Sequence, residues 1–386
     1  MTRPKTKTLL LAAAGIAVLA ALFVFKIQGG MADFEVNYRA GHRLALGETL
    51  YRTADSHWQF KYSPFSAMIY LPLSALPLPA AKAVWFLLVG TAIAAMIVLG
   101  GKLAAASGTP KPGPAVVLAV LILAKFFLRE IQLGQINALI TALLMGMALL
   151  LVRDDEAPSS RLRTEAGILW GLAAALKPYA LIFLPYLVLK RKGRALAWGA
   201  AVFAAALAVP SLFYGIRGNA TVLGEWVSSL SRSTPGLLVS QDNVSLLAFL
   251  MKWMHGSPAA SLVYGAGIAL LAALTLVFLR GGRDLPRAAV AESALLLVFI
   301  PLISPLGWDY TFLSAFAAVV LVMDRMPVFP KALRFLAALN FLIIALALYD
   351  VLGRRLYAEF MARSVPTLNF LLVAAALFYL RARKAV

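Results

Sequence analysis

Long apolar segments follow one another along the chain, and they constrain its fold more than any other feature. A helix that crosses the hydrocarbon core of a membrane needs about 20 apolar residues, with a range of roughly 17 to 25. Segments of this kind recur throughout the 386 residues, of which 62% are hydrophobic and only 14% charged. Because lipid cannot satisfy exposed backbone groups, such segments must be helical. The sequence therefore predicts an all-α polytopic membrane protein with about 11 to 12 membrane helices.

Most of the apolar segments have the length of a single span. The predicted spans are residues 8–27, 81–100, 115–129, 136–152, 195–214, 259–280, 288–303, 309–324, 333–349 and 366–380. The first has a basic start and no convincing cleavage site after it, so we expect an uncleaved helix.

Two apolar segments do not fit a simple span. Residues 64–79 contain several prolines, which remove backbone donors and kink helices, so a lateral or re-entrant piece is expected there. Residues 165–190 are interrupted by Lys177 and Pro178, and neither half is long enough to cross. We expect a broken pair that enters the membrane and returns, with Lys177 near its tip.

The basic residues indicate the orientation of the chain. Lys and Arg number 36 against 17 Asp and Glu, and they punctuate the apolar segments instead of forming a patch suited to nucleic acid. If 64–79 does not cross and 165–190 returns, more than half of them fall on one side, which the positive-inside rule makes cytoplasmic. Both termini then lie in the cytoplasm, and two long polar segments, 28–63 and 215–257, lie outside.

The domain organisation follows from this threading. No soluble domain, linker or internal repeat is visible, so we expect one integral-membrane domain over residues 1–386. Within it, 1–194 would form a core module that includes the first outer loop, 28–63. Residues 195–386 would supply further membrane helices and the outer loop 215–257. The chain has no cysteine, which excludes disulfides and a cysteine nucleophile.

The first outer loop contains a cluster of charges in GGMADFEVNYRAGHR. If residues 31–45 form a short interfacial helix, Glu35, Arg39 and Arg43 are spaced as an i, i+4 ion ladder. Asp33 shares its face with Asn37 and has no cation at that spacing, so it is the candidate for an unpaired carboxylate that faces a cavity. The alternative is that Asp33 caps the helix.

Lys177 is the most costly charge in the sequence. A cation within a broken apolar pair costs about 2.5 to 3.5 kcal/mol, and such residues are functional candidates. A phosphate would be a suitable counter-ion for a compact ammonium. The alternative is that Lys177 extends to the membrane interface.

Other polar motifs are predicted on the same outer face. They are KYSP with Tyr62, GQIN with Gln135 and Asn137, QDN with Asp242 and Asn243, and WDY with Trp308, Asp309 and Tyr310. Each has an ordinary explanation, either as part of an aromatic belt at the interface or as a helix cap. The histidines lack the spacing of metal ligands, so no metal site and no cofactor are predicted.

The ordered set of motifs resembles one enzyme family. ADFEVNYRAG, KYSP, LGQINALI, GLAAALKPYALIFLPYLVLKRKGR, QDNVSLLAFL and SPLGWDY, in this order, are similar to glycosyltransferase family 87, most strongly over residues 28–194. The resemblance implies the C-type glycosyltransferase fold of bacterial enzymes that use polyprenyl-phosphate-linked sugars. It also implies that Asp33 matches the catalytic aspartate and Lys177 the lysine-proline motif. Members often have a proline where this chain has Ser63.

From the resemblance and the residues together we expect an inverting hexosyltransferase of the bacterial inner membrane, with its active site facing the periplasm. It would move a sugar, with mannose expected, from a polyprenyl-phosphate donor to a glycan or glycolipid acceptor. Asp33 would be the general base and Lys177 and Arg129 would bind the donor phosphate. The other polar motifs would bind sugar, and residues 64–79 would hold the lipid tail. A transporter or flippase, which can also have a broken helix pair, and a ligase of lipid-linked glycans stay open as alternatives.

Overall fold

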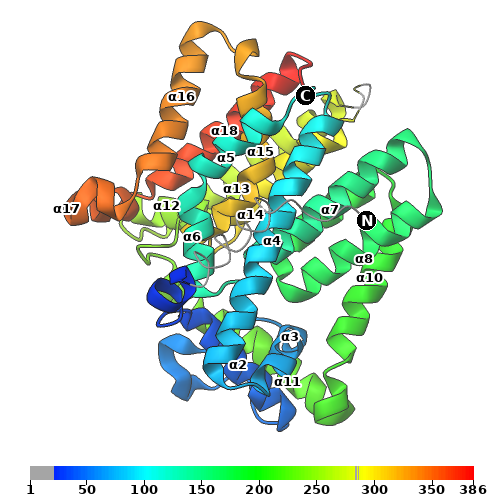
Figure 1. Ribbon diagram of the computed structural model, residues 1–386, viewed down its shortest axis with the longest axis vertical. Coiled ribbons are helices and arrows are strands. Elements are labelled where there is room, and N and C mark those ends of the chain that lie inside the picture. Colours follow the sequence, from blue (N-terminus) through cyan, green and yellow to red (C-terminus); the bar gives the residue numbers. More distant parts are fainter. Residues whose placement is uncertain (1–20, 283–284, 286) are drawn as a thin grey trace, which may run out of the picture.

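The computed structural model describes residues 21–282, 285 and 287–386, and this part of the chain consists of helices and their connections without a β-strand (Figure 1). An isolated antiparallel bridge joins Asn243 to Trp308. The predicted first span, 8–27, lies mostly outside the described residues. Its last residues form a π-helical turn.

The elements of the first half are η1 (Phe23–Ile27), α2 (Ala32–Ala45), η2 (Thr53–Trp58), α3 (Pro64–Ser74), α4 (Leu78–Ala106), α5 (Gly113–Ile122), α6 (Ala124–Leu133), α7 (Asn137–Glu156), α8 (Ser160–Leu176), η3 (Pro178–Ile182) and α9 (Phe183–Leu189). Those of the second half are α10 (Gly193–Ala208), α11 (Ser211–Ser233), η4 (Pro235–Leu237), α12 (Leu246–Trp253), α13 (Ala259–Gly281), α14 (Ala289–Ile303), η5 (Asp309–Ala315), α15 (Phe316–Asp324), η6 (Met326–Val328), α16 (Lys331–Leu346), α17 (Tyr349–Ala362) and α18 (Val365–Ala382).

Among the described residues, α4, α7, α13 and α18 are long and apolar enough to cross a membrane. Two bent pairs, α10 with α11 at 93° and α16 with α17 at 100°, raise the number of candidate spans to six. The prediction of an all-α polytopic membrane protein is confirmed. Within the part of the chain that the structure describes, full-length spans are fewer than the 11 to 12 helices that the apolar segments indicate.

Several predicted spans are broken or short in the structure. Residues 115–129 divide at Leu123 between α5 and α6, and residues 309–324 begin as the 3-10 helix η5. α14 is 15 residues long, roughly 22 Å, and its residues 289–302 are buried within the protein. A helix that is enclosed by other helices is apolar on all sides, but it need not be long enough to cross the lipid. Counting apolar segments in the sequence therefore overestimates the number of spans.

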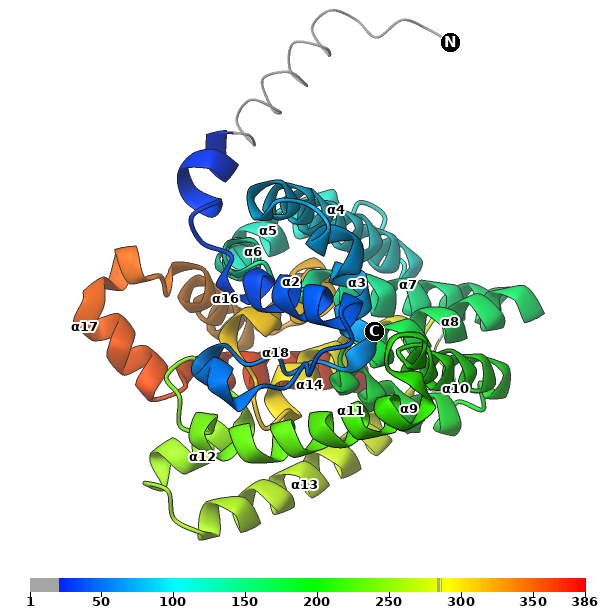
Figure 2. The ribbon, with the colours of Figure 1, turned by 90° about the horizontal axis from the view of Figure 1, so that it is seen from below.

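Within the predicted lateral or re-entrant piece 64–79, residues 64–74 form the separate helix α3, and the last two residues begin α4. Ser63 is the N-cap of α3 and accepts a hydrogen bond from the Ser66 N–H at 3.2 Å, with Pro64 in the first helical position. A turn then ends α3, and Pro77 precedes α4. α3 packs on α2, and the two form a layer at the lower end of the bundle (Figures 1 and 2).

Residues 165–190 are a broken pair, as predicted. α8 ends at Lys177, whose extended backbone is the conformation favoured before a proline. Arg163 near the start of α8 and Lys192 after α9 both pair with Asp154, at 2.8 and 2.9 Å. The pair therefore begins and ends on the same side, and α10 then runs alongside α8.

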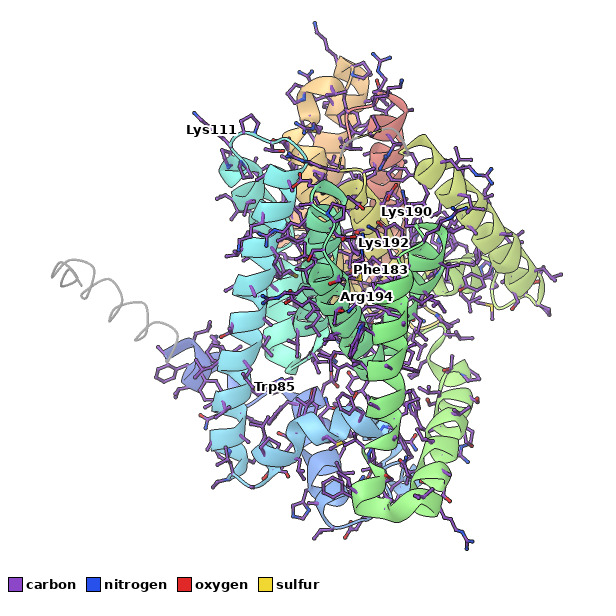
Figure 3. All side chains as sticks on the ribbon, turned by 90° about the vertical axis from the view of Figure 1, so that its right-hand side faces the viewer. Trp85, Lys111, Phe183, Lys190, Lys192 and Arg194 are labelled. Atoms are coloured by element: carbon purple, nitrogen blue, oxygen red, sulfur yellow. The ribbon has the colours of Figure 1, made fainter. Side chains whose placement is uncertain are left out.

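Three of the segments predicted to share the cytoplasmic side contact one another at one end of the bundle, namely 101–114, 325–334 and the C-terminal tail. The Thr109 hydroxyl donates to Asp324 at 2.7 Å, and Arg325 donates to the carbonyl of Ala385 at 3.2 Å. Figure 3 places Lys111 toward this end, away from the α2 layer. The contacts thus support the grouping of these connections on one side.

Candidate active site

The start of α2 places Asp33 at the lower end of the bundle. Met31 is the N-cap residue, in the left-handed conformation with φ 62°, and its N–H donates to the carbonyl of Gln132 at 2.9 Å. Asp33 is in the first turn and faces a cavity together with Asn37. The alternative role of Asp33 as the helix cap is therefore wrong, whereas its predicted shared face with Asn37 is confirmed.

A glycine turn brings the GQIN motif against α2. Gly134 ends α6 with φ 70°, and its carbonyl accepts a hydrogen bond from the Trp85 indole at 2.8 Å. A Cβ on Gly134 would lie 2.6 Å from the Cβ of Phe34, so only glycine allows this approach. The turn places Gln135 beside Asp33.

Gln135 connects four side chains from different elements, and its Oε1 also accepts from Asn137 Nδ2, two residues along the chain, at 3.3 Å. Its Nε2 donates to Asp33 Oδ2 at 2.5 Å and to the Tyr310 hydroxyl at 3.1 Å. Its Oε1 accepts from the Tyr62 hydroxyl at 3.0 Å and from Lys177 Nζ at 3.4 Å. Asp33 and Lys177, which are far apart in the sequence, are therefore joined through one amide.

Asn137 forms a second connection behind the cavity wall. Its Oδ1 accepts from Lys177 Nζ at 2.7 Å and from the Tyr179 hydroxyl at 3.2 Å. Its Nδ2 donates to Glu130 Oε2 at 2.8 Å, and Glu130 Oε1 accepts from the Ala138 N–H at 2.8 Å. Asn137 and Glu130 are both fully buried.

The end of α8, just before Lys177, is held by α3. The Ser63 hydroxyl donates to the carbonyl of Ala175 at 2.5 Å, and the Ser66 hydroxyl donates to that of Leu176 at 2.8 Å. The last carbonyls of a helix lack partners within it, so these two hydroxyls satisfy them and fix where the helix ends. The lateral piece thus positions Lys177.

KYSP forms one wall of the cavity. Lys177 Nζ lies 4.6 Å from the centre of the Tyr62 ring, within the range of a cation–π interaction. The carbonyl of Tyr62 accepts from the Tyr51 hydroxyl at 2.7 Å, and that of Lys61 accepts from the Trp226 indole at 3.1 Å. Burial lowers the pKa of the Lys61 ammonium, while the negative charge of Asp33 acts in the opposite direction.

The QDN and WDY motifs lie side by side at the rim. The Asp309 N–H donates to the carbonyl of Asp242 at 3.1 Å, and Asn243 accepts from the Gly307 N–H at 3.0 Å. Asp242 pairs with Arg129 at 3.3 Å, and both side chains are 42% exposed. Asn243 is fully buried and holds the two loops together, so its role in the structure is to support the rim.

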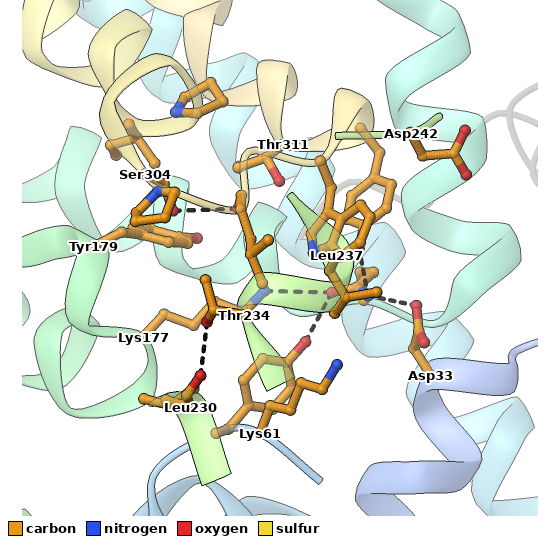
Figure 4. Close-up of a pocket in the computed structure, with 18 of the residues that line it drawn as sticks. Asp33, Lys61, Lys177, Tyr179, Leu230, Thr234, Leu237, Asp242, Ser304 and Thr311 are labelled. Atoms are coloured by element: carbon orange, nitrogen blue, oxygen red, sulfur yellow. Dashed lines mark hydrogen bonds between the residues drawn. The ribbon is translucent and has the colours of Figure 1, made fainter. Parts of the chain in front are cut away.

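These groups surround a cavity of about 870 Å³ (Figure 4). Asp33, Lys61 and Lys177 are among its charged lining residues. Its apolar lining includes Ile182 of η3 and Ile300 and Ile303 of α14. None of residues 64–79 contributes, so the expected lipid groove in that segment is not found. Within the described part of the chain, no group of three or more His, Cys, Asp and Glu side chains could hold a metal ion.

Comparison with known families identifies the class of protein. The family model described as "Glycosyltransferase family 87" matches residues 60–305, which is more than half of the chain. The chain belongs to glycosyltransferase family 87. The match begins after Asp33 and ends before Trp308, so the roles of these two residues rest on the geometry of the cavity.

Comparisons with solved structures and with curated proteins do not extend this family assignment. The family 87 glycosyltransferase described here has 14% sequence identity to ArnT from Cupriavidus metallidurans, whose crystal structure is bound to undecaprenyl phosphate. The similarity covers 98% of this chain and 78% of that one, with a TM-score of 0.39, and at that score it supports no argument about the site. A search of the curated proteins finds no match.

Most residues predicted for the site of this glycosyltransferase do line the cavity. They are Asp33, Tyr62, Arg129, Gln135, Lys177, Asp242, Trp308 and Tyr310. Asn137, Asn243 and Asp309 lie behind its wall, where the first contacts Lys177 and the other two belong to the rim loops.

The predicted ion ladder on α2 is wrong. Glu35 pairs with Lys82 of α4 at 2.7 Å, and Arg43 makes two hydrogen bonds to Asp55, at 2.5 and 2.9 Å. Exposed i, i+4 pairs contribute only a few tenths of a kcal/mol, so partners from neighbouring elements displace them easily. These pairs tie α2 to α4 and to the loop that leads to Lys61.

Glu130 and Tyr179 are parts of the site that the sequence reading missed. Glu130 is a carboxylate in the apolar stretch AKFFLREIQL, which becomes α6. Ionisable residues in such stretches are costly unless they are paired, and this cost was the signal that could have revealed it. Tyr179 follows Pro178 directly, but nothing in the sequence indicates its bond to Asn137.

Proposed function

We propose that this family 87 glycosyltransferase transfers a sugar from a polyprenyl-phosphate donor to a hydroxyl of a glycan or glycolipid, with inversion at the anomeric carbon. One observation carries the proposal: a carboxylate, Asp33, and a cation, Lys177, meet in one cavity and are held by the same amide of Gln135. Such a pair supplies a base for the acceptor and a positive charge for the leaving phosphate.

The reaction is a single displacement. Asp33 accepts the proton of the acceptor hydroxyl as its oxygen forms a bond to the anomeric carbon. The bond between that carbon and the phosphate oxygen breaks, and its electron pair leaves with the polyprenyl phosphate. Because the attack comes from the opposite face, a β-linked donor gives an α-linked product. Gln135 keeps the Asp33 carboxylate in place by donating to one of its oxygens.

Lys177 and Arg129 receive the charge that develops on the phosphate. Lys177 Nζ faces amide oxygens of Gln135 and Asn137 in place of a carboxylate, so its positive charge is available to an anion. Arg129 is held by Asp242 in a half-exposed pair of the kind that contributes at most about 1 kcal/mol, so its guanidinium can turn to a phosphate at little cost.

The remaining lining suits the other parts of the substrates. The apolar side chains of η3 and α14 offer a path for the lipid tail, and Trp308 and Tyr310 offer surfaces to a sugar ring. Mannose as the sugar follows from the family association. The basic connections at the opposite end of the bundle support a cytoplasmic location for that end, which directs the cavity toward the periplasm of a bacterial inner membrane.

The variant Asp33→Asn tests the base. Asparagine keeps an oxygen for the Gln135 amide but cannot accept the proton, so we expect transfer to fall about 10²- to 10⁴-fold. Rates are measured with purified protein in lipid nanodiscs, polyprenyl-phosphate mannose and a glycolipid acceptor, together with donor binding and thermal unfolding.

Asp350→Asn is the matched control, since Asp350 is exposed on α17 and does not line the cavity. Both variants should bind donor and unfold as the wild type does. Turnover near the wild-type rate in Asp33→Asn would refute the assignment of the base.

A further inference from the structure

We propose that Glu130 is a positioning residue that acts through Asn137 to hold the Lys177 ammonium where it binds a lipid-linked phosphate. The inference rests on the proposed function, because it concerns the phosphate of the same donor. Glu130 does not line the cavity, and it reaches Lys177 only through the side chain of Asn137.

The burial of Glu130 is the first observation. Its side chain has no exposed surface, and it lies on an amphipathic helix at a buried position where an unpaired carboxylate would be very costly. Two donors compensate this cost, the Ala138 N–H and the Asn137 Nδ2, each at 2.8 Å. Both carboxylate oxygens of Glu130 are therefore occupied.

The direction of these hydrogen bonds is the second observation. An ionised carboxylate only accepts hydrogen bonds, so Asn137 must turn its NH₂ group toward Glu130. Its oxygen then points to Lys177, at 2.7 Å. Gln135 repeats the arrangement: its NH₂ group faces Asp33, and its oxygen faces Lys177 at 3.4 Å. The carboxylates of Asp33 and Glu130 thus orient the side-chain oxygens of Gln135 and Asn137 toward the ammonium of Lys177.

The consequence for Lys177 is a fixed position without neutralisation. A carboxylate in direct contact would satisfy the ammonium and compete with a substrate anion. Amide oxygens hold two of its three N–H groups and carry no net charge. Within the described residues the third N–H has no hydrogen-bond acceptor, and the side chain lines the cavity, so this group remains for the phosphate.

Glu130→Gln separates positioning from simple electrostatics. Glutamine has one oxygen for two donors, so either Ala138 or Asn137 loses its acceptor on residue 130. The Asn137 NH₂ group then keeps only its longer hydrogen bond to Gln135 Oε1, at 3.3 Å, and is oriented less firmly. Positioning therefore predicts weaker phosphate binding. If Glu130 acted only through its charge, the variant would bind phosphate more tightly, because removing a nearby negative charge favours the binding of an anion.

The experiment compares two lipid probes, undecaprenyl phosphate and the uncharged undecaprenol, for binding to the full chain in nanodiscs. The ratio of the two dissociation constants isolates the phosphate. We expect this preference to fall about tenfold in Glu130→Gln, as for loss of a hydrogen bond to a charged group, with undecaprenol binding unchanged. The control Glu165→Gln removes an exposed carboxylate, and it should keep the wild-type ratio.

A double-mutant cycle with Asn137→Ala tests whether Glu130 acts through that residue. If it does, the double variant loses no more phosphate preference than Asn137→Ala alone. Additive losses, or a folded Glu130→Gln with an unchanged or higher preference, would overturn the inference. If Glu130→Gln does not fold, the inference is tested by Asn137→Ala alone. A preference for the phosphate that is unchanged in Asn137→Ala would then overturn the inference. A wild type without preference for the phosphate would instead contradict the proposed donor.

Discussion

Two charged side chains of α2, Glu35 and Arg43, find their partners in other elements and not on their own helix. Arg43 of α2 binds Asp55 through two hydrogen bonds, and the side chains are 13% and 18% exposed. The hydrogen bonds from Arg43 lower the pKa of Asp55, although partial burial opposes this shift. The pair fastens the loop before Lys61 to α2, the helix that contains Asp33.

The Arg43–Asp55 pair should make stability depend on pH. The pKa of Asp55 is lowered in the folded state, so its stabilisation is complete above the unfolded value of about 3.9 and is lost as the pH falls through the folded value. We expect Asp55→Asn to unfold at a lower temperature than the wild type at pH 7, with the difference shrinking toward pH 3. Thermal unfolding followed by tryptophan fluorescence measures it.

The exposed Asp350→Asn should show no such pattern. If Asp55→Asn lowers the unfolding temperature equally at pH 7 and pH 3, the loss of stability does not come from the ion pair.

At the scale of elements, the site depends on two joints between helices. One is the Gly134 turn between α6 and α7, which places Gln135 beside Asp33. The other is the end of α8, where Ser63 and Ser66 hold the carbonyls before Lys177. The residues that shape these joints are not proposed to take part in the reaction, yet they fix the distance between Asp33 and Lys177.

Gly134→Ala should damage both stability and activity. A left-handed conformation costs a residue other than glycine about 1 to 3 kcal/mol, and the added Cβ would lie 2.6 Å from that of Phe34. Relief of this contact moves α2 away from Gln135, so we expect a lower unfolding temperature and a loss of transfer of tenfold or more. Both are measured on purified protein.

Gly29→Ala is the matched control, since nothing lies within 4 Å of a Cβ there. It should behave as the wild type does. An active and stable Gly134→Ala protein would show that the turn is not needed in this form.

Local chemistry explains which elements the sequence could predict. The breaks at 64–79 and at Lys177 were predictable because prolines mark them. The break at Leu123 has no proline or glycine, so the apolar residues 115–129 predict one span where the structure has two helices. Likewise, Asp33 and Lys177 could be predicted as charges without local partners. The connection through Gln135 could not, because its four partners come from four separate segments.

At the scale of the whole molecule, the two ends of the bundle differ in composition. The α2 and α3 layer occupies one end (Figure 1), whereas Lys111, in one of the basic connections, lies toward the other (Figure 3). The pair formed by α8 and α9 returns to the side from which it starts. We therefore expect the later helices to have the direction that the basic residues require.

Labelling of single cysteines tests this topology, and the chain has no native cysteine to remove. Arg232, Lys111 and Arg191 are all exposed. In intact spheroplasts a membrane-impermeant maleimide should label Arg232→Cys, whereas Lys111→Cys and Arg191→Cys should react only after permeabilisation. Labelling is read from the mass shift of the purified protein.

Arg191 is the informative position, because it follows α9 directly. Labelling of Arg191→Cys from outside, together with Arg232→Cys, would mean that the broken pair crosses the membrane.

The order in which the chain is made gives the cavity a further property. Its walls run from Asp33 to Thr311, and the side contributed by α14 and η5 is the last to leave the ribosome. A growing chain that already contains Asp33 and Lys177 still lacks the wall of the cavity that α14 and η5 provide. Reactive lipid-linked sugar therefore meets a complete enzyme only after most of the protein has been synthesised, and truncated products that stop before α14 should be inert.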